Sequence, residues 1–209
     1  ACRKIAILTS LISGQHVDFE KIHTEGITKI TTEDMKYAKK LNMAIKLLAS
    51  SKRVGDTFSV LVAPMLLSEE HPLCNVNDVF NAVFVRGNML GDAMFYGSGA
   101  GKLPTASAVV ADVVDAAKHL HRNVVTRWDA GELELIPNAE AEHRFFVRVQ
   151  GRSEAQKEQI REAFGSVEIV ETEGLEDEFG FITEVMTEGT YSKKAEAFPE
   201  IIHMIRLAD

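Results

Sequence analysis

The first 66 residues alternate between helical and strand-like spacing of apolar positions. Apolar and small residues at intervals of three and four predict a helix over residues 2–13 and a shorter helix over residues 32–41. Residues 43–50 and 57–66 are apolar segments separated by a polar turn around Gly55. This order favours an antiparallel hairpin.

The following residues repeat this alternation and then change in character. Residues 79–86 and 91–96 predict a second hairpin, and Pro104 stands near the first turn of an amphipathic helix that runs to about His121. Between 127 and 142 the apolar periodicity fails, because acidic residues, Gly131 and Pro137 dominate, as in linkers. Strand-like and helical segments then follow in the order strand 143–150, helix 153–164, strands 166–172 and 179–187, helix 190–198 and strand 201–207.

These segments predict an α+β protein. We expect a mixed α/β domain over residues 1–125, with a sheet covered by helices, and a linker over 126–142. The βαββαβ order over residues 143–209 indicates a small ferredoxin-like domain. The first residue is Ala1, and helical spacing begins at once with no capping residue ahead of it. We therefore expect a piece of a longer protein that starts inside a helix.

Composition narrows the possible partners. The chain has 209 residues, of which 45% are hydrophobic, and its 31 acidic and 23 basic residues leave a net charge of −8. This charge repels phosphate backbones and anionic lipids, so nucleic acid and membrane surfaces are poor partners. Apolar runs are too short to span a bilayer, and two cysteines make no disulfide framework, so we expect a cytoplasmic protein.

Two groups of residues invite a functional interpretation. Gly97, Gly99 and Gly101 precede the predicted helix from Pro104, and such glycines permit either a close ligand contact or simply the backbone angles of a turn. Their spacing matches neither the P-loop nor the dinucleotide fingerprint. The seven histidines are scattered, and we expect no metal site. Lys4 stands beside Arg3, and its local sequence by itself predicts no more than a solvated surface lysine.

Seven segments in unbroken order over about residues 1–121 resemble homoserine dehydrogenases. They are ACRKIAIL (1–8), EGITKIT (25–31), YAKKL (37–41), AIKLL (44–48), HPL with VN (71–77), FNAVFV (80–85) and FYGSGAGKLPTASAVVAD (95–112). The last βαββαβ part resembles the regulatory ACT domain of many bacterial members. The resemblance implies an upstream Rossmann domain and an Asp just before Ala1, so that the acidic substrate ligands and the cation site also lie upstream.

Two functional positions carry over from this resemblance. Lys4 matches the catalytic lysine of the family, and Gly101 matches the last glycine of the loop that contacts the nicotinamide cofactor. The implied reaction is the interconversion of L-aspartate 4-semialdehyde and L-homoserine with NAD or NADP, on the route to threonine, methionine and isoleucine. The residue that selects NAD or NADP belongs to the upstream domain. We expect the 209 residues alone to be inactive.

The resemblance also implies a homodimer or a higher homo-oligomer, and an amino-acid effector of the ACT-like domain. The effector is in doubt because the loop after the first strand reads Gln150-Gly151-Arg152-Ser153-Glu154 instead of an Asp-x-Pro-Gly-like sequence. The alternative hypothesis is a non-catalytic module for amino-acid sensing or oligomerisation.

Overall fold

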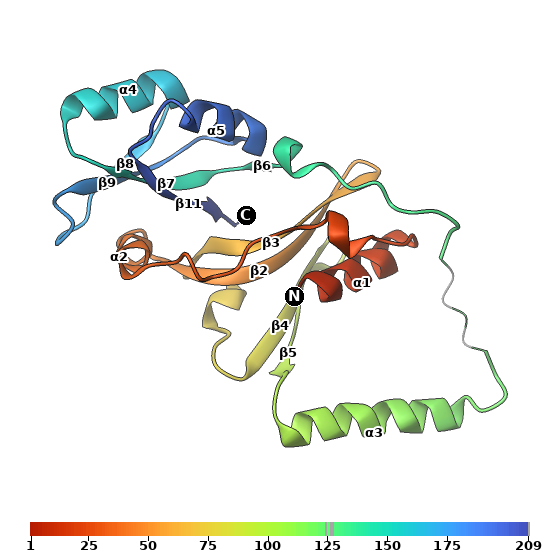
Figure 1. Cartoon of the computed structure of the whole chain (residues 1–209). Coiled ribbons are helices and arrows are strands. Elements are labelled where there is room, and N and C mark those ends of the chain that lie inside the picture. Colours follow the sequence, from red (N-terminus) through yellow and green to blue (C-terminus); the bar gives the residue numbers. More distant parts are fainter. Residues whose placement is uncertain (124, 126–127, 209) are drawn as a thin grey trace. The chain divides into compact units, whose positions relative to one another are not determined.

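The computed structural model describes residues 1–123, 125 and 128–208 and divides into two compact units (Figure 1). The first unit contains residues 1–68 and 128–209, and the second contains residues 69–127. Residues 126 and 127 of the predicted linker lie outside the described residues. The mixed α/β class predicted from the sequence is confirmed.

The first 68 residues form the predicted helices and hairpin. Helix α1 spans Cys2–Ser13 and ends at Gly14 in a left-handed conformation, whereas α2 spans Thr32–Lys40. Strands β2 (Met43–Val54) and β3 (Thr57–Ser68) pair without a break from Met43–Ser68 to Val54–Thr57. α1 lies on this hairpin through a core of apolar side chains: Ile5, Ala6, Val17, Ile22, Phe58, Val60, Val62 and Leu133.

The second edge of β3 is shared among segments far apart in the sequence. The short strand β1 (His23–Thr24), which the sequence pattern did not predict, pairs parallel with Leu61 and Val62. Further along, Arg206 and Leu207 of β11 (Ile201–Leu207) pair parallel with Met65 and Leu66. The hairpin and the C-terminal segment therefore belong to one seven-stranded sheet.

The C-terminal segment has the predicted βαββαβ order. Its elements are β7 (Phe145–Gln150), α4 (Glu154–Phe164), β8 (Glu168–Val170), β9 (Glu178–Ile182), α5 (Glu188–Ala195) and β11. The strands lie in the order β11-β7-β9-β8, and neighbours in this order are antiparallel. Because β11 also continues into the hairpin sheet, the predicted domain of residues 143–209 shares its backbone hydrogen bonding with residues 43–68.

The predicted strand 166–172 is shortened to β8, and two other predicted strands are each divided in two. Residues 143–150 divide into β6 (Glu142–His143) and β7, and residues 179–187 divide into β9 and β10 (Met186–Thr187). β6 and β10 pair with each other in a separate two-stranded sheet. The break between β9 and β10 begins at Thr183, whose N–H donates to the Phe145 carbonyl and whose hydroxyl, in place of a backbone carbonyl, accepts from the Phe145 N–H.

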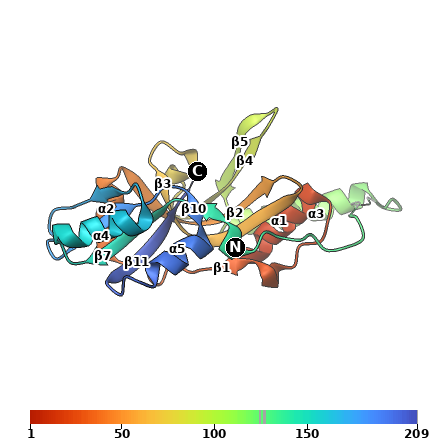
Figure 2. The ribbon, with the colours of Figure 1, turned by 90° about the horizontal axis from the view of Figure 1, so that it is seen from above.

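Helices cover both faces of the ferredoxin-like sheet, and the view from above shows α4 and α5 lying over one of them (Figure 2). Phe145, Val147 and Val149 of β7 face α4 and α5, in a core that includes Ile160, Phe164 and Tyr191. Side chains on the opposite face pack against Tyr37 and Ala38 of α2: Phe146, Val170, Ile182, Ile205 and Leu207. A helix from the N-terminal half of the chain therefore closes the face that α4 and α5 leave open.

The second unit consists of a hairpin and a helix. β4 (Phe80–Gly87) and β5 (Gly91–Ser98) pair from Phe80–Ser98 to Gly87–Gly91, and α3 spans Lys102–Lys118. The hairpin and the helix confirm the sequence prediction. No described residue of α3 is buried within this chain, and Val109, Val110 and Val113 are each more than half exposed.

Candidate active site

Lys4 lies in the first turn of α1, and the opposite face of this helix is firmly anchored. Ile5, Ala6, Thr9 and Ser10 are buried against the hairpin. The Thr9 hydroxyl donates to the Ile5 carbonyl and contacts Ser51 Oγ, both at 2.8 Å. Ser10 Oγ accepts from the Val17 N–H at 3.0 Å. The backbone that carries Lys4 is thus held on a rigid element.

The outer face of α1 is apolar around Lys4. Ile7 and Leu11 stand three and seven residues after Lys4, so the three side chains share one stripe of the helix. Ile7 is 56% exposed and Leu11 55% exposed. Large exposed apolar patches mark surfaces that a partner or a substrate covers, and Ile7 and Leu11 contribute to such a surface beside Lys4.

Gly101 is the N-cap of α3, and its backbone is in a conformation that only glycine adopts readily. Its φ is 122° and its ψ is 159°, a region from which a Cβ atom is excluded. The Gly101 carbonyl accepts from the Thr105 N–H at 3.1 Å. The turn therefore requires glycine at this position whether or not a cofactor contacts it.

The two predicted site residues lie in different units, Lys4 in the first and Gly101 in the second. Within the described residues, no group of three or more His, Cys, Asp or Glu side chains is arranged to hold a metal ion. No helix in the described part of the chain is long and apolar enough to cross a membrane.

A buried ionic group, which we call the Arg148 cluster, joins α2 to the ferredoxin-like sheet. It consists of Thr31, Asp34, Arg148, Glu178 and His203. Arg148 donates to Asp34 Oδ1 at 2.8 Å, to Thr31 Oγ1 at 3.0 Å, and to both carboxylate oxygens of Glu178 at 3.0 and 2.7 Å. His203 Nδ1 lies 3.0 Å from Asp34 Oδ2. The side chains of Asp34 and Arg148 are 0% and 4% exposed.

Asp34 also belongs to the capping box of α2, in which Thr31 is the N-cap residue. Asp34 Oδ2 accepts from the Thr31 N–H at 2.8 Å, and its own N–H donates to Thr31 Oγ1, which completes this capping box. Burial alone raises the pKa of this carboxyl, but the hydrogen bonds from His203, Arg148 and the Thr31 backbone lower it to about 2. Asp34 is therefore ionised at neutral pH.

A second group, the Arg206 cluster, also combines one arginine with two carboxylates and a histidine. It consists of His23, Glu25, Glu188 and Arg206. His23 lies on β1 and Glu25 directly after it, whereas Glu188 begins α5 and Arg206 lies on β11. Arg206 is 2% exposed and forms a two-point ion pair with Glu188, and its Nη2 also donates to Glu25 Oε1 at 2.8 Å. His23 Nε2 lies 2.6 Å from the same oxygen. Burial raises the pKa of Glu25, but its bonds to Arg206 and His23 outweigh this effect and lower it.

Neither cluster was predicted from the sequence. A signal was present in the strand FFVRVQ, where Arg148 stands two residues after Phe146 and so shares its buried face. A charged side chain at such a position requires buried partners. Two of these partners, Thr31 and Asp34, lie more than 100 positions away, which no local pattern identifies.

Comparisons with known proteins agree with this architecture. A family model described as homoserine dehydrogenase matches residues 1–114. The homoserine dehydrogenase of Mycobacterium tuberculosis is 33% identical over 96% of this chain and 50% of its own length. That of Neisseria gonorrhoeae is 36% identical over 74% of the chain and 37% of its own length. The chain thus spans about half the length of these relatives, or less.

Solved structures show the same likeness over the whole chain. A homoserine dehydrogenase from Thiobacillus denitrificans superposes with a TM-score of 0.86 at 29% identity, and the match covers 100% of this chain and 52% of the other. A homoserine dehydrogenase from S. aureus superposes with a TM-score of 0.76 at 25% identity. The family model covers more than half of the 209 residues, and the structural match extends through the ferredoxin-like segment. The chain belongs to the homoserine dehydrogenase family.

Proposed function

We propose that this chain forms part of an NAD(P)-dependent homoserine dehydrogenase that interconverts L-aspartate 4-semialdehyde and L-homoserine. The family match supports this function. The single structural observation that carries the proposal is the position of Lys4, at the start of an anchored helix and on a stripe with the exposed Ile7 and Leu11. A lysine in this setting is placed to meet a substrate that another part of the enzyme holds.

The described residues fit one edge of a nicotinamide cofactor site. Gly101 at the N-terminus of α3 presents a backbone without a Cβ atom, which permits the close contact that the family resemblance implies. The described residues include no parallel βαβ unit with a glycine fingerprint, and none of them selects NAD over NADP. When bound, the cofactor supplies or accepts the hydride.

Lys4 has a defined task in this reaction. Hydride addition to the aldehyde carbon places a negative charge on the carbonyl oxygen, and the Lys4 ammonium both stabilises that charge and donates the proton that completes the alcohol. In the reverse direction the neutral Lys4 amine accepts this proton. We propose that Lys4 works with an Asp one turn earlier in the helix, because residues four apart share a face.

The test is Lys4→Ala in the full-length enzyme. General acid catalysis predicts a loss of roughly 10² to 10⁴ in kcat. The exposed Lys4 contributes little to folding, so the melting temperature and the affinity for the cofactor should stay unchanged. Lys193→Ala, at another exposed lysine on a helix outside α1, is the matched control. A Lys4→Ala enzyme with near-normal kcat would assign Lys4 to the protein surface and favour a non-catalytic sensing or oligomerising module.

We further propose that the 209 residues by themselves do not oxidise homoserine, because they contain only one edge of the cofactor site. Exposed apolar side chains on α1 and α3 support assembly into homo-oligomers. Cys2 and Cys74 are both free thiols, which supports a reducing, cytoplasmic compartment. Measurable homoserine oxidation by the purified chain with either cofactor would contradict the first of these proposals.

A further inference from the structure

A cavity of about 260 Å³ lies in the first unit, where residues 24–30 meet β3 and β11. On β3 it reaches Pro64, between the residues that pair with β1 (61–62) and those that pair with β11 (65–66). The cavity therefore lies at the gap between two strands that share one edge of β3. Pockets for drug-sized ligands start at roughly 300 Å³, so this cavity suits a smaller molecule. Its apolar wall consists of Ile30, Pro64, Met204 and Ile205.

The Arg148 and Arg206 clusters both reach this cavity, and each carries a net negative charge. Each combines one buried arginine with two carboxylates. His203 of the first cluster and Glu25 of the second line the cavity. The exposed Lys29 also lines it and offsets one of the two charges. While the histidines are neutral, one negative charge stays in excess, and a cation in the cavity would balance it.

The hydrogen bond to Asp34 determines which nitrogen of the His203 ring is an acceptor. His203 Nδ1 lies 3.0 Å from Asp34 Oδ2. Because the pKa of Asp34 is lowered to about 2, this oxygen belongs to an ionised carboxylate and only accepts, so Nδ1 carries a proton. In a neutral imidazole the second nitrogen then has no hydrogen and is an acceptor. No other residue that the structure describes bonds to Nε2, which leaves it for a ligand.

Two further acceptors line the cavity beside this nitrogen. Glu25 Oε1 accepts from both Arg206 and His23, at 2.8 and 2.6 Å, whereas no described residue donates to Oε2 of the same carboxylate. Thr24 Oγ1 uses its proton on a backbone carbonyl at 3.2 Å and keeps its lone pairs. Lys29 does not occupy these acceptors, because its side chain forms no hydrogen bond or ion pair with any described residue.

We propose that this cavity binds the primary ammonium group of a small aliphatic amine. The three N–H groups donate to Glu25 Oε2, His203 Nε2 and Thr24 Oγ1, and the alkyl chain contacts the apolar wall around Ile30 and Met204. A monocation matches the single negative charge in excess, whereas a carboxylate would meet acceptors only and be repelled. None of the lining residues belongs to α1, so the site is independent of the reaction proposed for Lys4.

Butylammonium is the probe for this site, and butan-1-ol is its neutral counterpart of the same length. We expect butylammonium, titrated into the 209-residue chain at pH 8 and low salt, to cause saturable NMR shifts in the methyl groups of Ile30, Met204 and Ile205. Free imidazole is neutral at this pH. Butan-1-ol should cause no saturable shifts. Tetramethylammonium carries the same charge without an N–H group and should bind about tenfold more weakly or less.

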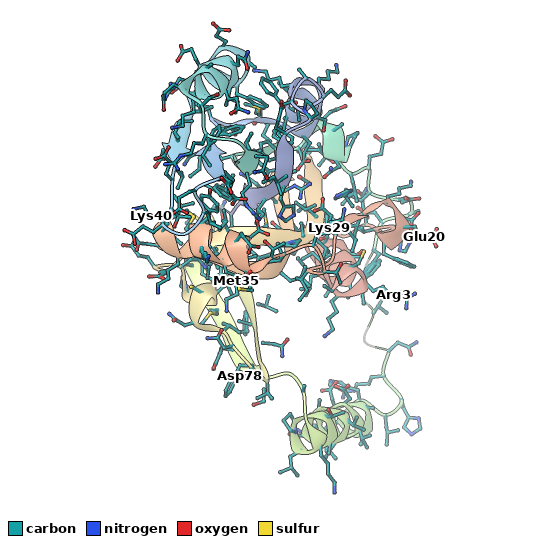
Figure 3. The ribbon with its side chains drawn as sticks, turned by 60° about the vertical axis from the view of Figure 1, so that its left-hand side comes forward. Arg3, Glu20, Lys29, Met35, Lys40 and Asp78 are labelled. Atoms are coloured by element: carbon teal, nitrogen blue, oxygen red, sulfur yellow. The ribbon has the colours of Figure 1, made fainter. Side chains whose placement is uncertain are left out.

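Two variants should change the affinity in opposite directions. Glu25→Gln removes the negative charge that pairs with the ligand, and this loss should weaken binding about tenfold or more. Lys29→Met removes a like charge from an exposed position and should strengthen binding about twofold or more at low salt. Lys40→Met is the control and should bind normally, because Lys40 lies at the far end of α2 from Lys29 (Figure 3). General damage to the fold does not produce a gain in affinity.

Three outcomes would overturn the proposal. One is the absence of saturable shifts with butylammonium in excess. Another is an affinity for butylammonium that stays unchanged in Glu25→Gln or falls in Lys29→Met, because the charges of the cavity would then not select the ligand. The third is binding of butyrate or tetramethylammonium at least as tight as that of butylammonium. None of these outcomes bears on Lys4 or on homoserine turnover.

Discussion

Arg148 is the residue whose removal should harm the fold most, because two buried carboxylates depend on it. Arg148→Met keeps much of the side-chain volume but removes all four of its hydrogen bonds to Thr31, Asp34 and Glu178. Asp34 is fully buried and Glu178 is 10% exposed, so water does not replace the lost guanidinium. Removal of one partner of such a buried pair costs about 3 to 5 kcal/mol of unfolding free energy.

The pH dependence of this loss follows from the same contacts. The pKa of Asp34 is lowered in the folded protein from 3.8 to about 2, which corresponds to roughly 2 kcal/mol of stability. Because the folded pKa is the lower one, this stability is present above the unfolded value and is lost as the pH falls through about 2. In the Arg148→Met variant the Asp34 carboxyl loses the hydrogen bonds that lower its pKa and takes up its proton at a higher pH. The destabilisation should therefore be largest at neutral pH and shrink below about pH 5.

Urea denaturation followed by circular dichroism at pH 7 and pH 4 measures both effects. Arg161→Met is the matched control, because Arg161 forms an exposed ion pair with Glu158 on α4, at 3.1 Å, that is worth about 0.3 to 0.5 kcal/mol. A loss below about 1 kcal/mol for Arg148→Met at pH 7 would refute the reasoning, since exposed pairs reach that value. A loss that stays constant between the two pH values would show that the cost does not come from unpaired carboxylates.

Two further predictions concern the ferredoxin-like segment. Gly180→Ala would place a Cβ atom 2.5 Å from Cε2 of the buried Phe146 ring, so we expect urea denaturation to show a loss of about 1 to 3 kcal/mol in unfolding free energy. Gly26→Ala is the control and should cost less, because open space surrounds Gly26. Equal losses in the two variants would contradict the close packing. The Gln156 side chain fills the loop after β7: it approaches Gly151, accepts a hydrogen bond from the Ser153 N–H and donates one to the Gln150 carbonyl. We therefore expect calorimetry on the whole chain to detect no micromolar threonine binding. A micromolar Kd for threonine would disprove this expectation.

Local sequence patterns were sufficient for the elements themselves. The period of the apolar residues determines α1, α2, α3 and the two hairpins, because each of these elements forms its hydrogen bonds among neighbours in the chain. The period of the apolar residues also predicts the βαββαβ order of the C-terminal segment. Lys4 and Gly101 were found only through resemblance to a family, since a single lysine or a single glycine carries no pattern of its own. Their roles stay predictions, although the backbone angles of Gly101 give an independent reason for glycine there.

The tertiary structure alone decided how the C-terminal segment joins the rest of the first unit. The parallel pairing of β11 with β3 and the placement of α2 on the open face of the sheet connect residues more than 100 positions apart. The Arg148 and Arg206 clusters seal this junction with buried charges. Each charged residue is unfavourable on its own strand and becomes stable only beside partners from distant segments, so its role follows from the assembled fold and not from its neighbours in the sequence.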